Sequence, residues 1–303
     1  MSAKAAILAA LALAGCAPQA APPVPGPAAT APTGQALAAA CAGRDGWSDP
    51  APPAKIHGNT YYVGTCGITA LLIDAPGGLV LIDAATAEAA PHILSNIRAL
   101  GFDPADIGVL LASHEHHDHV GGLAALQLAT GAPVFASAAA AAQLRSGEPE
   151  ARDPQRGAIE PFNGVVVADA ALRDGQTVRI AGLQLTLHAT PGHTPGSTSW
   201  TWRSCEGDDC RTIAYVDSLS AVSADDYRFR DHPDYVAMMR ATSAKVAALP
   251  CDILITPHPS ASNLFARFAG TAPLAGPDQC RAYAADASAR LDARLAKEAA
   301  AAP

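Results

Sequence analysis

The sequence is poor in aromatic residues, in charge and in basic groups. Aromatic residues make up 5% of the 303 positions and charged residues 16%, and the formal net charge is −8. This acidic balance, without a basic stripe, argues against a nucleic acid as the main partner. Past residue 16, no stretch is long and apolar enough to span a bilayer.

Two chemical patterns are absent as well. The chain contains no Cys-x-x-Cys, which weakens the case for a cysteine metal site, and no Ser-x-x-Lys, which leaves a covalent serine mechanism of that type unsupported. Hydrophobic residues nevertheless make up 50% of the chain. Disorder of the whole chain is therefore excluded, because this much apolar surface can offset the entropy lost on folding.

The first residues have the pattern of a secretory signal peptide. Lys4 gives a short positive region, and Ile7 to Ala14 form an apolar run of signal-peptide length. The segment Leu13-Ala14-Gly15-Cys16 resembles the bacterial lipobox, in which cleavage leaves an N-terminal cysteine that carries lipid. We therefore expect a lipoprotein-type signal peptide at residues 1–15, a periplasmic location and a membrane tether through Cys16. An ordinary signal peptide, cut further on with Cys16 discarded, is the alternative.

Residues 16–40 are rich in Pro and Ala and are predicted to form a disordered tether, so that residues 41–303 form the folded domain. The chain has seven cysteines, and export makes three disulfides possible among those that follow Cys16. The sequence alone does not choose among the pairings. Pairing in sequence order predicts the disulfides Cys41–Cys66, Cys205–Cys210 and Cys251–Cys280.

Strand-like and helix-like segments alternate along the folded part, separated by Gly and Pro. The expected strands are 61–63, 69–73, 79–82, 109–112, 172–180 with a turn at Asp174, 183–190, 199–202, 212–216 and 253–256. The expected helices are 88–100, 123–130, 137–144, 234–249 and one after Pro277. Residues 148–162 are predicted to be a surface loop. This order fits a sandwich with sheets inside and helices outside.

A histidine-rich loop follows the apolar run 109–112. Imidazole and carboxylate are the ligands that suit zinc, and a catalytic zinc keeps one position open for water. The loop offers four such side chains, too many for one open site and suitable for two adjacent metals: His114, His116, Asp118 and His119.

Two further histidines lie in similar turns. His193 lies in Thr190-Pro191-Gly192-His193-Thr194-Pro195-Gly196-Ser197, and His258 lies in Thr256-Pro257-His258-Pro259, each after an apolar strand. Pro and Gly fix the backbone and remove bulk, as a rigid ligand loop requires. A chance run of histidines on the surface would not explain these matching turns, so the sequence predicts metal binding.

The pattern His-x-His-x-Asp-His, with distant single histidines, resembles the signature of the metallo-β-lactamase fold superfamily. The segments 191–198, 217–220, 249–252 and 256–259 look like those of subclass B3 metallo-β-lactamases, and the similarity runs from about Cys41 to the final helix. It implies an α/β fold, an αββα sandwich of two mixed β-sheets flanked by helices, with two zinc ions per chain. The first zinc would be held by His114, His116 and His193, and the second by Asp118, His119 and His258.

The resemblance also implies roles in the reaction. Asp118 would orient the hydroxide shared by the two zinc ions, and Ser218 and Ser220 would bind the substrate carboxylate. Asp217 leaves a second possibility open, because in glyoxalase-type hydrolases of the superfamily an aspartate in this region bridges the metals.

Four other positions are of interest. Glu115 and His117 occupy variable positions of the motif and are expected at the rim or supporting the ligands, where Glu115 could steer charge near the mouth. Asp83 is expected to support the site, although alanines follow it where the superfamily usually has a glycine. Trp47 matches a family position near the cleft, or else anchors the N-terminal segment.

The resemblance implies zinc-dependent hydrolysis of the β-lactam amide bond of penicillins, cephalosporins and carbapenems, giving antibiotic resistance. The expected protein is a monomer that acts on a small-molecule β-lactam and binds no nucleic acid. Two alternatives remain: another hydrolase of this fold acting on a lactone or thioester, and a non-catalytic zinc-binding lipoprotein.

Overall fold

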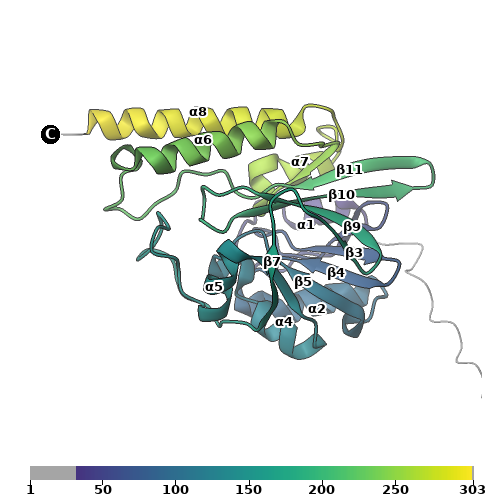
Figure 1. Ribbon diagram of the computed structural model, residues 1–303. Coiled ribbons are helices and arrows are strands. Elements are labelled where there is room, and N and C mark those ends of the chain that lie inside the picture. The colour runs from purple at the N-terminus through teal and green to yellow at the C-terminus, as the bar shows by residue number, and fades with distance from the viewer. Residues whose placement is uncertain (1–31, 302–303) are drawn as a thin grey trace, which may run out of the picture.

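The computed structural model describes residues 32–301 and contains two β-sheets packed face to face (Figure 1). The strands of the first sheet lie in the order β1 Ala54–His57, β2 Thr60–Tyr62, β3 Leu71–Ala75, β4 Gly78–Ile82, β5 Ile107–Leu111, β6 Val134–Ser137 and β7 Val167–Leu172. The second sheet has the order β12 Ile253–Ile255, β11 Asp209–Tyr215, β10 Thr198–Glu206, β9 Leu183–Ala189 and β8 Thr177–Ile180. Both sheets are mixed, because β4 to β7 and the pair β11–β12 are parallel while the other pairs are antiparallel.

Helices cover the outer face of each sheet (Figure 1). The first sheet packs against α2 Ala90–Ala99, α4 Leu123–Thr130 and α5 Ala138–Ser146. The second packs against α6 Pro233–Ala247 and α8 Gln279–Ala300, which lie side by side. The shorter helices are α1 Gly34–Ala40, α3 His117–Val120 and α7 Leu264–Phe268. The architecture is the αββα sandwich that the sequence predicted.

Strand β4 shows how the sequence builds these layers. Val80 and Ile82 lie in the core between the two sheets, whereas Leu79 and Leu81 lie in the core beneath the helices of the first sheet. Successive residues of a strand point to opposite faces, so a strand buried on both faces is apolar throughout. The run 79–82 therefore marks a central strand, and β5, which bears the histidine-rich loop, pairs beside it.

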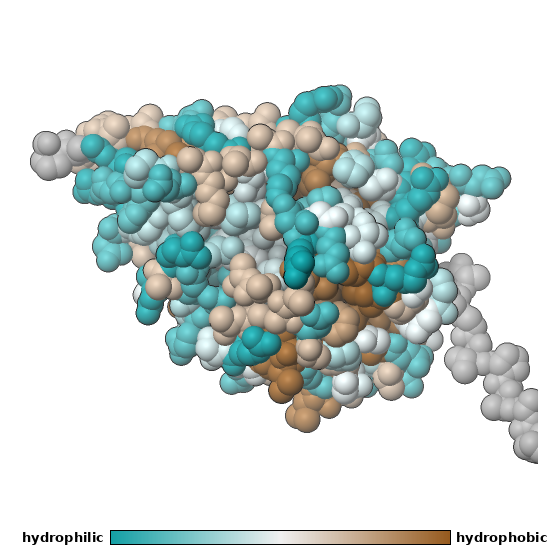
Figure 2. Space-filling model, viewed as in Figure 1, coloured by the Kyte–Doolittle hydropathy of each residue, from teal (hydrophilic) through white to brown (hydrophobic). Residues whose placement is uncertain are grey.

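Figure 2 shows hydrophilic and mildly apolar side chains intermixed, with strongly apolar patches over the lower layer and the centre right and a smaller one along the upper helices. The most exposed large hydrophobic residues are Leu128 of α4 and Val166, at 88% and 74%. Gln127 binds both the N–H and the C=O of Val166, so these two residues belong to the same part of the surface. Leu128 and Val166 thus place the two most exposed large hydrophobic side chains of the described residues in the α4 layer.

The predicted tether of residues 16–40 extends too far, because its last residues form α1. Thr33 caps this helix by accepting a hydrogen bond from Ala36 N at 3.3 Å, and Leu37 is fully buried. The segment has a good N-cap and helix-favouring alanines and no proline after Pro32. The folded unit therefore begins before Cys41. The predicted signal peptide, Cys16 and tether residues 16–31 lie outside the described residues.

Most of the expected strands and helices are present, but six elements of the described residues were not foreseen. These are α1, β1, α3, β6, β7 and α7, each of seven residues or fewer. Strand β6 lies between Pro133 and α5, and it is recognisable only by its parallel pairing with β5 and β7. Segments this short carry too little periodicity to be identified without their partners.

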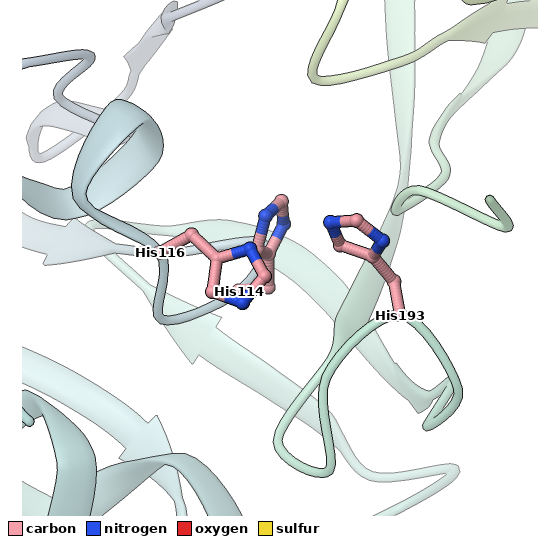
Figure 3. A group of neighbouring side chains, drawn as sticks. All are labelled: His114, His116 and His193. Carbon is pink, nitrogen blue, oxygen red and sulfur yellow. The ribbon is translucent and has the colours of Figure 1, made fainter. Parts of the chain in front are cut away.

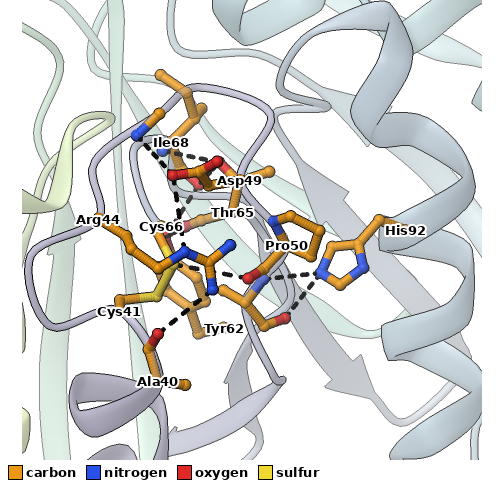
Figure 4. Close-up of a disulfide and its surroundings, with 12 residues drawn as sticks. Ala40, Cys41, Arg44, Asp49, Pro50, Tyr62, Thr65, Cys66, Ile68 and His92 are labelled. Carbon is orange, nitrogen blue, oxygen red and sulfur yellow. Dashed lines mark hydrogen bonds and ion pairs between the residues drawn. A yellow bond between two sulfur atoms is a disulfide. The ribbon is translucent and has the colours of Figure 1, made fainter.

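The structure joins the cysteines in sequence order, as Cys41–Cys66, Cys205–Cys210 and Cys251–Cys280. Figure 4 shows the first of these, which ties the end of α1 to the loop before β3. Close by, His92 of α2 contacts the backbone of Ala51, and Cys66 N donates to Asp49 O at 2.9 Å. The disulfide and these hydrogen bonds fasten the segment 41–51 to the first sheet. Among residues 32–301, no helix has the length and apolarity needed to cross a membrane.

Candidate metal centre

The histidine-rich loop begins where β5 ends, and Asp83 holds its first residue. The Asp83 carboxylate accepts hydrogen bonds from Ser113 N at 2.6 Å, from Ser113 Oγ at 2.7 Å and from the Tyr215 hydroxyl at 2.5 Å. Asp83 and Ala85 have positive φ angles of 64° and 52°. The turn after β4 therefore adopts the left-handed conformation without the glycine that the superfamily usually has, and it aims a buried carboxylate at the start of the loop.

Three of the predicted ligands converge on one point (Figure 3). His114 and His116 follow β5, and His193 lies in the loop between β9 and β10. The ring centroids are 4.9 Å apart for His114 and His116, 4.7 Å for His114 and His193, and 5.0 Å for His116 and His193. All three side chains are buried, and one nitrogen of each lies within 4.8 Å of the others.

In each of these rings, a neighbouring group binds the nitrogen that faces away from the cluster. His114 Nδ1 lies 2.7 Å from Asp217 Oδ1, and His193 Nδ1 lies 3.2 Å from the carbonyl oxygen of Ser220. In His116 the order is reversed, because Nε2 lies 2.8 Å from Asp153 Oδ2. These acceptors place a proton on the outward nitrogen, so that His114 Nε2, His116 Nδ1 and His193 Nε2 carry the lone pairs that a metal would use.

The other predicted ligands form a second cluster beside the first. Asp118 Oδ2 lies 3.1 Å from His119 Nε2 and 3.4 Å from His258 Nε2. The two imidazole nitrogens are 3.3 Å apart. The rings of His114 and His119 have centroids 4.2 Å apart, which places the clusters side by side.

The electrostatics of both clusters suit a cation. Burial lowers the pKa of His114 and of His193 well below the usual value and that of His258 to about 4, so these rings are neutral, the form that binds metal. Burial alone would also lower the pKa of His119, but the Asp118 carboxylate outweighs it and raises this pKa to about 10. The second cluster therefore stabilises positive charge, which a divalent cation would supply.

The residues present thus fit a metal. His114 Nε2 is buried and has no hydrogen-bond partner in the described part of the chain, although buried polar atoms are normally paired. Five imidazoles and one carboxylate converge, with no thiolate among them, and this donor set suits zinc. The arrangement can hold two cations side by side.

Comparison with known proteins agrees with this geometry. Residues 63–206 match the Metallo-beta-lactamase superfamily. The crystal structure of the metallo-β-lactamase MIM-1 from Novosphingobium pentaromativorans is 55% identical, with a TM-score of 0.86 over 89% of this chain and 100% of that chain. MEM-A1, a subclass B3 metallo-β-lactamase from a soil metagenome library, is 43% identical, with a TM-score of 0.79 over 84% of this chain and 99% of that chain.

The chain belongs to the subclass B3 metallo-β-lactamases. Its curated sequence relatives match over shorter segments. The hydroxyacylglutathione hydrolase of Pseudomonas entomophila is 38% identical over 91 residues, which are 30% of this chain and 26% of that protein. The chain spans about half the length of such relatives or less, as the 52% coverage of the enzyme from Cereibacter sphaeroides illustrates.

In this metallo-β-lactamase, the two serines predicted to bind substrate lie directly after β11. Ser220 is partly exposed, and its Oγ lies 3.0 Å from His193 Nδ1. Ser218 is buried, at 6% exposure. The hydroxyl oxygen of Ser220 can accept from the imidazole while its hydrogen stays available to a ligand. The substrate-binding role of both serines stays a prediction.

Of the two places expected for Glu115, the structure gives the one behind the ligands and not the rim, where it could have steered charge. Its side chain is buried and accepts hydrogen bonds from Gly196 N and from Thr194 Oγ1, both at 2.9 Å. Burial raises the pKa of Glu115 to about 7. Glu115 therefore joins the loop of His114 and His116 to the loop of His193 from behind.

Trp47 lies at the edge of the metal centre, as the resemblance implied. It is 45% exposed, and its ring centroid lies 5.6 Å from that of His117 and 6.0 Å from that of His258. A surface hollow of about 340 Å³ adjoins it, lined in part by Gly67, His258 and Ser260. A flat apolar ring beside the ligands offers a contact surface for a bound small molecule.

The sequence analysis missed Asp153, which belongs to the predicted surface loop 148–162. Only 4% of the residue is exposed. Gln155, two residues further, has its side-chain nitrogen 3.4 Å from His193 Nε2. No local pattern in the sequence distinguishes these residues from ordinary loop residues.

Proposed function

We propose that this metallo-β-lactamase binds two zinc ions and hydrolyses the β-lactam amide bond of penicillins, cephalosporins and carbapenems. The observation that carries the proposal is the convergence of the imidazoles of His114, His116 and His193 beside the cluster of Asp118, His119 and His258. Two zinc ions held by these side chains would supply a hydroxide near neutral pH and polarise the lactam carbonyl.

Asp118 is suited to orient the attacking water. Burial would raise the pKa of this carboxyl group, but the neighbouring His119 outweighs burial and holds the pKa well below its usual range. The group is therefore a carboxylate at neutral pH. Its oxygen atoms can accept a hydrogen bond from the nucleophile and fix the direction of attack.

Ser218 and Ser220 are suited to bind the carboxylate that β-lactams carry next to the scissile ring. They lie after β11 on the same side of the fold as His193, and Ser220 contacts that ligand directly. Hydroxyl donors at this position would orient the ring so that its carbonyl faces the metal centre. We further propose that the enzyme acts as a monomer on a small-molecule substrate and confers antibiotic resistance.

The N-terminal sequence supports a periplasmic location, with a lipid on Cys16 as the tether. Export would place the enzyme where β-lactams meet their cell-wall targets. If the tether exists, globomycin inhibits processing and osmotic shock without detergent leaves the activity with the membranes. Release of all activity by osmotic shock would contradict it.

The function is tested with the purified domain after removal of residues 1–31. We expect turnover of nitrocefin and of a carbapenem that EDTA abolishes and zinc restores. Two zinc ions per chain, counted by metal analysis, are expected in the active form. A folded protein that holds two zinc ions but turns over neither compound would overturn the proposal.

A thioester hydrolase is the second candidate, favoured by the presence of Asp217 and by the hydroxyacylglutathione hydrolases among the relatives. One Asp217 oxygen is engaged by the outward nitrogen of His114, which supports a role behind the ligand rather than between the metals. Hydrolysis of S-lactoylglutathione without nitrocefin turnover would favour this candidate. Zinc binding without turnover of either compound would favour a non-catalytic zinc-binding protein.

A further inference from the structure

Segment 148–162 contains no helix or strand, and yet one of its carboxylates is buried in the metal centre. The side chain of Asp153 is 1% exposed. Its Oδ2 lies 2.8 Å from His116 Nε2, and its Oδ1 accepts a hydrogen bond from Gln155 N at 2.8 Å. Both oxygen atoms are therefore engaged, one by a metal-ligand candidate and the other by the backbone of the segment itself.

This contact determines which nitrogen of His116 can bind a metal. A carboxylate has no proton to donate, so Asp153 must accept a hydrogen bond from His116. It therefore places the proton of His116 on Nε2 and leaves the lone pair on Nδ1. His114 and His193 have the opposite arrangement, because Asp217 and Ser220 bind their Nδ1 atoms. His116 is therefore the member of the trio that faces the shared point with Nδ1, and Asp153 is the group that selects it.

The residue after Asp153 joins the segment to a second wall of the site. Next to Asp153, the carbonyl oxygen of Pro154 accepts a hydrogen bond from Ala224 N at 2.8 Å. Ala224 follows Ser218 and Ser220 in the loop after β11, so the segment is joined at adjacent residues to His116 and to the loop that bears these serines. Its neighbour Arg152 remains exposed and pairs with Glu150.

We propose that Asp153 is a positioning residue that holds His116 in the tautomer with a free Nδ1 and anchors segment 148–162 beside the metal centre. The proposal rests on the proposed function, since it assumes that His116 binds the first zinc. Groups that orient a ligand imidazole commonly change metal affinity by about 10- to 100-fold when they are removed. The loss of Asp153 should therefore weaken the first zinc site without removing a ligand.

The test compares Asp153→Ala and Asp153→Asn with the wild-type protein. The dissociation constant of each zinc is measured by competition with a chromophoric chelator. We expect zinc in the first site of Asp153→Ala to bind about 10- to 100-fold more weakly. Asp153→Asn should lose less affinity for zinc in the first site, because its amide oxygen can still accept a hydrogen bond from His116 Nε2. Glu150→Gln, a matched change on the same segment at a carboxylate that pairs with the exposed Arg152, should leave both constants unchanged.

Two readouts separate positioning from a general loss of structure. In metal-free protein, ¹⁵N NMR of His116 should show protonated Nε2 in the wild type and a mixture of tautomers in Asp153→Ala. Trypsin should cut the variant faster at Arg152 or Arg156, with near-UV circular dichroism unchanged. If Asp153→Ala fails to fold, Asp153→Leu, which is similar in size to aspartate and also offers no acceptor, takes its place. A pure Nε2–H tautomer with wild-type zinc affinity and cleavage rate in the folded Ala or Leu variant would overturn the proposal.

These outcomes are independent of β-lactam turnover. Weakened zinc in Asp153→Ala together with no nitrocefin hydrolysis by the wild type would overturn the proposed function and leave the role of Asp153 standing. Unchanged zinc affinity in the variant together with full turnover by the wild type would overturn the role of Asp153 and leave the proposed function standing.

Discussion

The carboxylate of Asp217 lies behind His114, with Oδ1 2.7 Å from Nδ1, and both side chains are fully buried. Because a buried carboxylate makes a strong, charge-assisted hydrogen bond, it orients the ring and raises its basicity toward a metal. We predict that Asp217→Asn lowers the affinity for the first zinc by about 10- to 100-fold and leaves the second site close to wild type. Metal analysis after dialysis against graded chelator measures both. Loss of both metals together would instead indicate that Asp217 bridges them.

Replacing Glu115 should destabilise the fold because its side chain is buried and accepts hydrogen bonds from two buried donors. In Glu115→Ala, the buried donors Thr194 Oγ1 and Gly196 N lose their acceptor. An unsatisfied buried donor costs about 1 to 3 kcal/mol, so we expect a loss of at least that size in the free energy of unfolding. Glu115→Gln keeps one acceptor oxygen, so its free energy of unfolding should fall by less. Urea unfolding of metal-free protein measures both, and equal stability of all three forms would show that the contact contributes nothing.

The turn between β8 and β9 should be improved by a single substitution. Ala181 and Gly182 both have positive φ, at 48° and 82°, as a two-residue type I′ hairpin requires. Asparagine tolerates this conformation better than alanine does, so Ala181→Asn should stabilise the fold by up to about 1 kcal/mol. Ala42→Asn, at an exposed position without positive φ, is the control and should bring no gain. A lower unfolding midpoint for Ala181→Asn would contradict the interpretation of the turn.

The disulfides should differ in their contribution to stability according to the chain length that each closes. Cys41–Cys66 and Cys251–Cys280 span 25 and 29 residues, whereas Cys205–Cys210 spans 5 across the β10–β11 hairpin. Chain-entropy arguments give about 3.5 kcal/mol for loops of the longer size and about 2 kcal/mol for the hairpin. Replacing each pair by serine and measuring thermal unfolding should give this ranking. A hairpin variant as destabilised as the other two would contradict it.

The candidate ligands that the structure brings together could be located from the sequence because each lies in a short segment directly after an apolar strand. The segment from His114 to His119 can be recognised by its composition, and the turns around His193 and His258 can be recognised by their Pro and Gly residues. The groups that hold these ligands could not be predicted, since Asp153 meets His116 across 37 residues and Glu115 meets Thr194 across 79. Such pairs are created by the packing of the loops, and nothing local in the sequence marks either carboxylate.

The same limit applies to the fold. Residues 79–82 can be recognised as a strand from the sequence alone, because an apolar run of this length must be buried on both faces. Strand β6 and helix α1 depend on neighbours far along the chain, which is why the first was missed and the second was assigned to the tether.

The contact between Glu115 and Gly196 also constrains how this enzyme can diverge from its relatives. A side chain at position 196 would place its Cβ 2.5 Å from Glu115 Oε1 and 2.8 Å from the Cα of Ala140. An acid at 115 thus requires a residue without a side chain at 196, and a larger residue at 196 becomes acceptable only if position 115 becomes smaller and the helix at Ala140 shifts. Across homologous chains, these positions should change together rather than one at a time, so a graft of either loop alone from a relative should fail where a graft of both succeeds.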